Sequence, residues 1–463
     1  MENGRLHIFR KIIRSGVEIK IKGKRYSLKY PSRVWNKFPK VLHKVFADNL
    51  TYVFTWHLPF IEKKPLAYHF AHPLVEPTFF KILLYSIPMN IFENIEISTT
   101  ELIKQFYNYN FQAQFKALNH IYSSRKVRQN LKEKAILLFS FGKESLLIFG
   151  LLKELGINTS LFFMTEPQSG FENSHKKKLA KKFYEKFDEE VEFFPLSIGK
   201  LRQEGDLYWG WDVILSQYVF ILIPYFFYNQ TKYLFIGNEQ SCNFYTRDSE
   251  GYLVNPVYEQ SVSVMQLLQD IPKIFFANTH IGSLVEPVHE IFVTYILHHR
   301  YPEIGRFQMS CFSEEPQAKT NRWCNHCEKC ARMYIFFKAL NISPDRVGFY
   351  NVDGGMLAAE KKKYFVLFND TKGESSYGGS GLGRDEQLLA FYLAYKNGVK
   401  GPLMSEFKKH FLKEAEKKKD KLIKEYFSLH SSYSLPPILR RRVLKIFEKE
   451  QESVINYLAK TLR

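Results

Sequence analysis

The stretch that most constrains how this chain can fold is residues 134–155, where the spacing of apolar residues changes abruptly. Residues 135–139 are all apolar, which predicts a strand buried on both faces of a parallel sheet. From Leu146 onward the apolar residues recur at helical spacing, and Gly156 stands where a helix would end. Residues 140–145 therefore form the turn between the carboxyl end of a strand and the amino end of a helix.

This turn has the composition of an anion-binding site. Free backbone N–H groups and the positive end of the helix dipole meet at a helix N-terminus, so a phosphate can bind there. Gly142 lets the backbone come close to a ligand, and Lys143 supplies charge. Ser140 and Ser145 offer hydroxyl donors. A Walker A loop is excluded because its first glycine would fall on Leu137, whereas an ordinary serine-capped turn remains an alternative.

Alternating strand and helix patterns follow the turn. Strands are predicted at residues 157–164, 191–196 and 233–236, and helices at residues 173–187 and 213–228. This alternation is typical of an α/β fold, a parallel sheet with helices on both faces, whose ligands bind at the carboxyl ends of the strands. The polar residues directly after the later strands are Glu166, Gly237, Asn238 and Glu239. Glu166 is either a site residue or a solvated loop acid.

The cysteine spacing predicts a metal site. Four of the five cysteines, Cys311, Cys324, Cys327 and Cys330, include two overlapping Cys-x-x-Cys steps that bring three thiolates to one point. A fourth sulfur completes a tetrahedron for zinc and leaves no open position, which predicts a structural zinc knot. An iron–sulfur cluster or a redox pair remains an alternative. We interpret the fifth, Cys242, as a packed thiol because no base is evident beside it.

The sequence shows no pattern typical of export or of membrane insertion. Residues 1–10 lack a long apolar region and a cleavage site, so we expect a cytoplasmic protein whose thiols are reduced. The most apolar window, residues 213–228, is interrupted by Pro224 and is shorter than the ~20 residues that span a bilayer. We interpret this window as a buried helix and expect no membrane partner.

Residues 140–145 resemble the Ser-Gly-Gly-x-Asp-Ser loop of the PP-loop ATP pyrophosphatases, which belong to the adenine nucleotide alpha hydrolase-like proteins. Phe141 replaces the first glycine and Glu144 replaces the aspartate. The resemblance implies a HUP-like fold, ATP and magnesium as cofactors, and adenylation that releases AMP and pyrophosphate. It assigns nucleotide binding to the loop residues Ser140, Gly142, Lys143, Glu144 and Ser145, and Gly237 and Asn238 join them at the end of the last strand.

Two branches of these enzymes share further features with the chain. A loop followed downstream by a four-cysteine knot is similar to the 7-cyano-7-deazaguanine synthases. Residues 236–243, 254–261, 284–290 and 323–330 are closer to the ATP-dependent UDP-N-acetylmuramoyl-L-alanyl-L-glutamate epimerases. Pro256, Val257 and Glu286 depart from that pattern, since polar residues and a basic residue are expected there.

The epimerase resemblance implies a substrate that carries a carboxylate, the terminal L-glutamate of a cell-wall-type precursor. Adenylation acidifies the α-hydrogen of that glutamate, and a side-chain base then removes and returns the proton. Glu239, His289 and Glu290 are the candidate catalytic residues, with a plain helix-surface position as the alternative for His289 and Glu290. A deazaguanine-type synthase, a tRNA-thiolating enzyme and a non-catalytic zinc-bearing nucleic-acid adaptor are the other hypotheses.

The length of 463 residues exceeds what one core usually holds. We expect an aromatic-rich N-terminal α+β domain at 1–125, the ATP pyrophosphatase domain with its zinc site at 126–345, and a helical C-terminal region at 346–463. Alternation of apolar and polar residues at 17–30 predicts a hairpin that turns at Gly23. A helix is predicted at residues 101–122. The Gly-rich segment 372–386 is either a second anion site, a flap, or a linker.

The net charge of +19 raises the question of nucleic-acid binding. Most lysines lie in helical patterns with interspersed acids, as on solvated helix faces, and residues 440–442 form the sharpest basic cluster. We therefore expect weak binding that falls steeply with salt, and a nucleic-acid partner is possible but not favoured.

Overall fold

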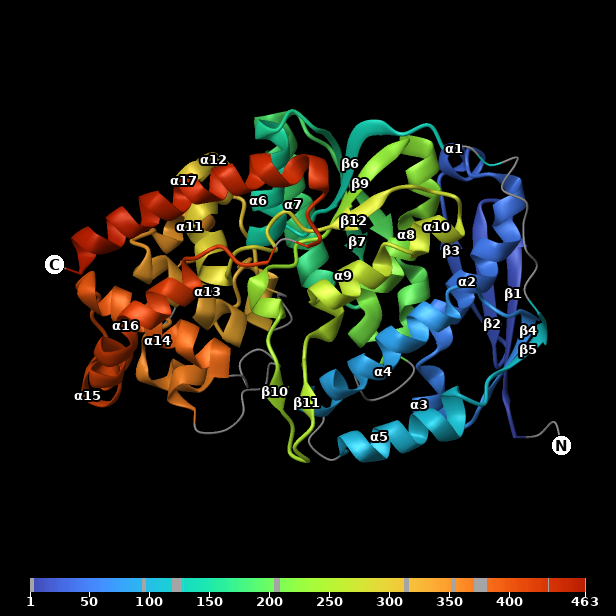
Figure 1. Ribbon diagram of the computed structural model, residues 1–463, viewed down its shortest axis with the longest axis horizontal. Helices are drawn as coiled ribbons and strands as arrows, with labels where there is room; N and C mark the ends of the chain where they lie inside the picture. The colour runs from blue at the N-terminus through green and yellow to red at the C-terminus, as the bar shows by residue number, and fades with distance from the viewer. Residues whose placement is uncertain are drawn as a thin grey trace. The chain divides into compact units, whose positions relative to one another are not determined.

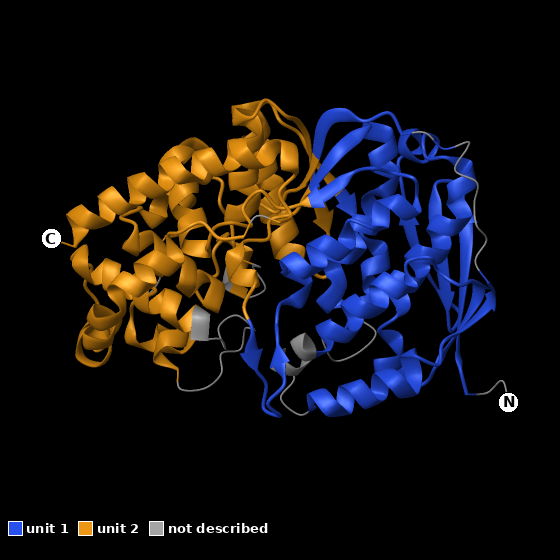
Figure 2. Cartoon of the chain, viewed as in Figure 1, with its two compact units in different colours: residues 1–135, 194–234, 245–281 blue, residues 136–193, 235–244, 282–463 orange. Residues whose placement is uncertain are grey.

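The computed structural model describes residues 4–462 apart from 94–96, 119–126, 128, 204–208, 312–315, 351–354, 370–380 and 432. The chain divides into two compact units, coloured separately in Figure 2. Unit 1 holds residues 1–135, 194–234 and 245–281, and unit 2 holds residues 136–193, 235–244 and 282–463. Each unit is therefore assembled from segments that lie far apart in the sequence.

Unit 1 contains a five-stranded sheet of order β3-β2-β1-β4-β5. Its strands are β1 (Leu6–Ile13), β2 (Gly16–Ile21), β3 (Lys24–Lys29), β4 (Leu66–Ala71) and β5 (Gln114–Ala117). The predicted hairpin is confirmed, because β2 and β3 pair antiparallel around Lys22 and Gly23. Both turn residues have positive φ, 48° and 79°, as a two-residue hairpin turn matched to strand twist requires.

The early helices of unit 1 are α1 (Ser32–Trp35), α2 (His43–Thr55), α3 (Leu58–Glu62), α4 (Glu76–Glu93) and α5 (Thr99–Gln105). The helix predicted at residues 101–122 is wrong at residues 111–118, and its last part, 119–122, lies outside the described residues. After α5 one π-helical turn, Phe106–Asn110, ends the helix, and β5 pairs parallel with β4. Phe115 on β5 packs across this sheet, and its ring stacks on that of Tyr68 at 4.9 Å.

The later helices of unit 1 are α8 (Ile214–Asn229), α9 (Val262–Leu268) and α10 (Ile271–Ile274), beside a small hairpin of β10 (Thr246–Arg247) and β11 (Leu253–Val254). Among the described residues one helix, Trp211–Asn229, is long and apolar enough to cross a membrane, and 67% of its most apolar window is buried. Its side chains from Val219 to Ile223 are fully buried, as the predicted core helix requires.

The second sheet is parallel throughout, with the order β12-β9-β6-β7-β8, and helices flank it. Its strands are β6 (Lys132–Leu138), β7 (Asn158–Thr165), β8 (Val191–Pro195), β9 (Thr231–Phe235) and β12 (His280–Gly282). Helices α6 (Lys143–Glu154) and α7 (Gly170–Phe187) follow β6 and β7. The predicted α/β pattern is confirmed, and the loops after β6, β7 and β9 all belong to unit 2.

The rest of unit 2 is helical (Figure 1). Its helices are α11 (Glu290–Arg300), α12 (Pro302–Gly305), α13 (Glu328–Ala339), α14 (Gly381–Lys396), α15 (Pro402–His410), α16 (Leu412–Tyr426) and α17 (Pro437–Thr461). Helix α13 packs on α14 and α14 on α16, while α11 contacts α6 and α17. Most of the Gly-rich segment 372–386 lies outside the described residues, and α14 begins at its end.

Candidate functional site

The loop 140–145 joins β6 to α6 at the carboxyl edge of the parallel sheet. Gly142 is the N-cap residue of α6, with φ −70° and ψ 160°, and no side chain caps the helix. Ser140 Oγ accepts the Gly142 N–H at 3.2 Å, and Ser145 Oγ donates to the Gly142 carbonyl at 3.1 Å. The two serines thus fix the shape of the turn, while the first turn of α6 keeps its N–H groups free of side-chain caps.

Phe141 takes the backbone conformation that a glycine favours. Its φ is 58°, in the left-handed region, where a side chain costs about 1 to 2 kcal/mol. The ring is fully buried and lies 4.7 Å from the ring of Phe139 and 5.7 Å from that of Phe183. Burying a phenylalanine contributes about 1.5 to 3 kcal/mol, which offsets the strain. The departure from the glycine of the PP-loop pattern therefore changes the side chain and leaves a glycine-like backbone.

Gly237 follows β9 and touches the start of α6. A Cβ added at Gly237 would lie 2.7 Å from Glu144 Cβ, so only glycine fits without movement. Next to it, Asn238 is buried and its Nδ2 makes no hydrogen bond to any described residue. Glu166, after β7, is only 5% exposed, so its interpretation as a solvated loop acid is wrong. A buried amide donor without a partner is a position where a ligand can supply the missing acceptor.

A buried network of charges lies directly beside the loop. Lys143 is 4% exposed and pairs through Nζ with Glu144 and, at 2.6 Å, with Glu290 Oε1. The second oxygen of Glu290 lies 2.9 Å from Arg332 Nε. Glu290 is thus held between two cations, one from the predicted loop and one from α13. The alternative that places Glu290 on an exposed helix surface is wrong, because the residue is buried.

The network separates the pKa values of its two central carboxyls. Burial and the charge of Glu290 raise the pKa of Glu239 to about 8, although Lys143 opposes the shift. Burial also acts to raise the pKa of Glu290, but Arg332 and Lys143 outweigh it, so the pKa falls below its usual value. Burial, Arg332 and Lys143 lower the pKa of Lys329 to about 8. Carboxyls with pKa values pushed apart in this way are typical of acid–base chemistry.

His289 contacts Ser241 and Glu425, both in unit 2. Its Nδ1 lies 3.0 Å from Ser241 Oγ, which also accepts the Glu290 N–H at 3.3 Å. Its Nε2 lies 3.4 Å from Glu425 Oε1, and burial lowers its pKa. Of the predicted catalytic residues, Glu239 and Glu290 therefore share the network with Lys143, whereas His289 reaches it only through Ser241. Like Glu290, His289 is buried and not a helix-surface residue.

Glu286, where a basic residue was expected, has a structural role. Its carboxylate accepts the N–H groups of Tyr433 and Ser434 at 2.8 and 2.6 Å, and the Ser431 hydroxyl at 3.3 Å. A carboxylate can accept several N–H groups. A lysine or arginine side chain could not bind these N–H groups, because it has donors and no acceptor. The acid therefore attaches the segment before α17 to the segment before α11.

The four predicted cysteines come together, as expected. Their sulfurs lie within 4.8 Å of one another, and those of Cys324 and Cys330 are 3.7 Å apart. Tetrahedral zinc with Zn–S bonds of about 2.3 Å separates its sulfurs by about 3.8 Å, so the residues fit such an ion. All are free thiols rather than disulfides, and Cys242 lies apart from them, 3.6 Å from Glu239 Oε1. The grouping is confirmed, and zinc itself stays a prediction.

Helix α13 connects the cysteine cluster to the charge network. Cys327 is its N-cap residue, and the Cys327 sulfur accepts the Cys330 N–H at 3.4 Å. The same helix carries Lys329 and Arg332. Neither was predicted as a site residue, because the spacing of the cysteines says nothing about the residues between and after them. Their position in a helix that begins at Cys327, one of the predicted metal ligands, was the available signal.

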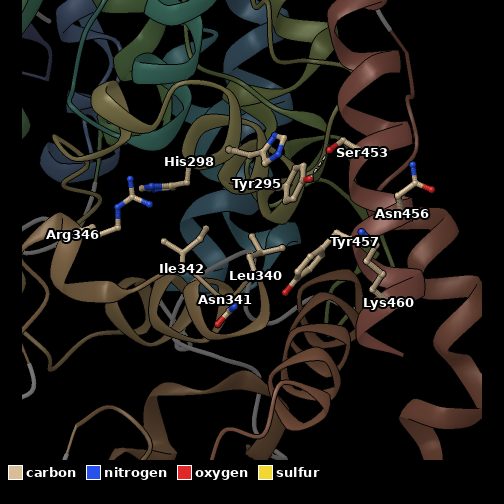
Figure 3. A pocket seen from close by; sticks show the side chains of 11 residues that line it. Tyr295, His298, Leu340, Asn341, Ile342, Arg346, Ser453, Asn456, Tyr457 and Lys460 are labelled. Carbon is tan, nitrogen blue, oxygen red and sulfur yellow. Dashed lines mark hydrogen bonds between the residues drawn. The ribbon is translucent and has the colours of Figure 1, made fainter. Parts of the chain in front are cut away.

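A separate cavity of about 470 Å³ lies in unit 2 (Figure 3). It is lined mainly from α11, α17 and the segment after α13, and the Tyr295 hydroxyl lies 3.0 Å from Ser453 Oγ at its wall. Its cations Arg346 and Lys460 suit an anion, but no carboxylate and none of the network residues lines it. Because its histidines have no carboxylate beside them in the lining, we rank the cavity below the network as a candidate for chemistry.

Comparison of the chain with protein-family models, with curated proteins and with solved structures finds no match in any of the three.

Proposed function

We propose that this protein is an ATP-dependent enzyme of the PP-loop ATP pyrophosphatase type, which adenylates a carboxylate on a small molecule and releases AMP and pyrophosphate. The observation that carries the proposal is the buried pairing of Lys143 with Glu290 at 2.6 Å beside the uncapped start of α6. Buried charges are costly to keep, and those with perturbed pKa values often serve function.

The residues around the loop fit a nucleotide. N–H groups at the start of α6 and the Ser140 hydroxyl suit a pyrophosphate, and Lys143 supplies charge. The Ser145 hydroxyl would turn from the Gly142 carbonyl to the phosphate. The unpartnered Asn238 Nδ2 offers a further donor at the neighbouring strand end. Magnesium, when bound, neutralises phosphate charge, and Glu144 is the loop carboxylate that would hold it. Positioning and charge stabilisation would then account for most of the rate.

The two central carboxyls support different roles. Glu290 stays ionised between Lys143 and Arg332, so it orients these cations rather than moving a proton. Glu239, with a pKa of about 8, can hold or release a proton near neutral pH. This suits the epimerase hypothesis, in which a base removes and returns the α-hydrogen of an adenylated terminal L-glutamate. His289 supports the network through Ser241 rather than acting as the base.

The alternatives predict other outcomes for the same site. A 7-cyano-7-deazaguanine-type synthase or a tRNA-thiolating enzyme would share the ATP chemistry and differ in the acceptor. A non-catalytic zinc-bearing adaptor would have no use for a buried ion-pair network of Lys143, Glu290 and Arg332 beside the loop. The network therefore favours an enzyme over an adaptor. The zinc at the cysteines would be structural in each case.

The deciding experiment measures which products of ATP appear. With L-glutamate-terminated cell-wall precursors as acceptors, we expect AMP and pyrophosphate, and an exchange of the α-hydrogen with solvent. Gly142→Val should abolish turnover, because a Cβ there already meets Ser140 Oγ at 3.1 Å. Gly170→Val is the matched control, since a Cβ at Gly170 meets nothing within 4 Å. Release of ADP and phosphate, or full activity in Gly142→Val, would contradict the proposal.

A further inference from the structure

We infer that His289, Glu425 and His430 form a second metal site, which binds a divalent transition-metal ion and leaves a coordination position open. One ligand atom from each residue lies within 4.8 Å of the others. His289 precedes α11, Glu425 lies in the last turn of α16, and His430 follows α16. All three belong to unit 2, and the inference does not rest on the proposed function.

The strongest support is the unsatisfied nitrogen of His289. The side chain is 1% exposed, and Nε2 makes no hydrogen bond to any described residue, although Glu425 Oε1 is 3.4 Å away. A metal ion between Nε2 and this carboxylate oxygen would give the buried nitrogen the close partner that the 3.4 Å contact does not provide. The other nitrogen, Nδ1, lies 3.0 Å from Ser241 Oγ. Metal-binding histidines usually fix their second nitrogen by such a hydrogen bond, which orients the ring.

His430 repeats this arrangement. Its Nε2 lies 2.8 Å from the backbone carbonyl of Glu425, an acceptor, so Nε2 carries the proton and Nδ1 keeps the lone pair for a metal. The His430 N–H donates to the Pro287 carbonyl at 2.8 Å, which holds the residue beside His289. The two rings are 4.7 Å apart and perpendicular at 88°. His430 thus keeps a lone pair on Nδ1, and His289 keeps one on Nε2 in the tautomer whose Nδ1–H donates to Ser241 Oγ.

The ligand set indicates the class of metal. Two imidazoles and one carboxylate suit zinc, and they also suit iron or manganese, but not calcium or magnesium, which prefer oxygen ligands. The Glu425 side chain is 45% exposed, so solvent can reach the remaining position. Three protein ligands with one open position are typical of catalytic sites, whereas the four cysteines form a closed one.

Cobalt(II) is the probe that separates the two sites. Protein purified with its cysteine-bound metal retained is titrated with cobalt(II), and bound metal is counted by mass spectrometry. We expect one additional equivalent, with visible d–d bands and no thiolate charge-transfer band, because nitrogen and oxygen are the ligands. His430→Ala and Glu425→Gln should each weaken this binding at least tenfold and leave the cysteine-bound metal in place.

The controls are His410→Ala and Glu416→Gln, which change exposed residues of the same types on α15 and α16. Both should bind cobalt(II) as the wild type does. Wild-type protein that takes up no additional equivalent would overturn the inference without any variant. Equal cobalt binding by wild type and by both ligand variants would overturn it as well.

Discussion

Lys143 Nζ and Glu290 Oε1 form a buried ion pair at 2.6 Å that joins the first residue of α6 to the first residue of α11. A glutamate is favourable at a helix N-terminus, whereas a lysine is not, because both the ammonium and the dipole end are positive. The Glu144, Glu290 and Glu239 carboxylates outweigh the opposing effect of burial and raise the pKa of Lys143. A cation held against the dipole in this way suits a site for an incoming anion.

Replacing the central carboxylate should destabilise the fold. Glu290→Gln leaves Lys143 and Arg332 with one uncompensated buried charge, and we expect a loss of about 3 kcal/mol in the free energy of unfolding. Denaturant unfolding measures the loss. Glu303→Gln, which removes an exposed partner of Lys186 and Arg306, is the control and should change stability by less than about 0.5 kcal/mol. Equal stability of the two variants would show that the Glu290 pairing adds nothing.

The raised pKa of Glu239 makes stability depend on pH. In the unfolded state the Glu239 carboxyl loses its proton above pH 4.5, whereas in the folded state it keeps the proton until about pH 8. Folding therefore binds protons in this window, so stability is greatest at its acidic end and declines as pH rises through it. Glu239→Gln should flatten this part of the stability profile. A profile unchanged in the variant would mean that Glu239 is ionised in the fold.

Removing the cysteine-bound metal should disturb the charge network as well as the fold. Cys327 begins α13, and the same helix positions Arg332 against Glu290. In Cys327→Ser we expect loss of the bound metal, a lower melting temperature and weaker ATP binding. Cys242→Ser, at the cysteine outside the cluster, should keep the metal. Unchanged melting in Cys327→Ser, or iron and sulfide in place of zinc, would contradict a structural zinc site.

Phe141→Gly tests whether the loop keeps its shape without the aromatic ring. Glycine relieves the strain at φ 58° but removes a fully buried ring, so we expect a net destabilisation of about 2 to 3 kcal/mol. ATP affinity should change little, because the backbone conformation is already the one glycine favours. Affinity that falls with stability would show that the ring itself supports the nucleotide site.

The sequence predicted those parts of the site that follow from local pattern. The β6–α6 turn was found because apolar spacing changes there, and Glu239 was placed near it because parallel strands end at one edge. The cysteine cluster followed from spacing. Arg332 was missed because its role depends on where α13 points, and His430 because its partner His289 is far away in the chain. The helix at residues 101–122 failed where pairing with β4 outweighed local spacing.

Gly237 gives the most direct test of whether the loop after β9 and the start of α6 form one binding surface. In Gly237→Ala the added methyl group would lie 2.7 Å from Glu144 Cβ, so the strand end and the helix must move apart. Overpacking of this kind costs about 1 to 3 kcal/mol of stability. The displacement also shifts Glu144 and the neighbouring Lys143, so we expect ATP to bind at least tenfold more weakly, measured by calorimetry. Gly170→Ala, where a Cβ meets nothing within 4 Å, should leave both quantities unchanged. If Gly237→Ala loses stability but binds ATP normally, the nucleotide does not lie between these two segments.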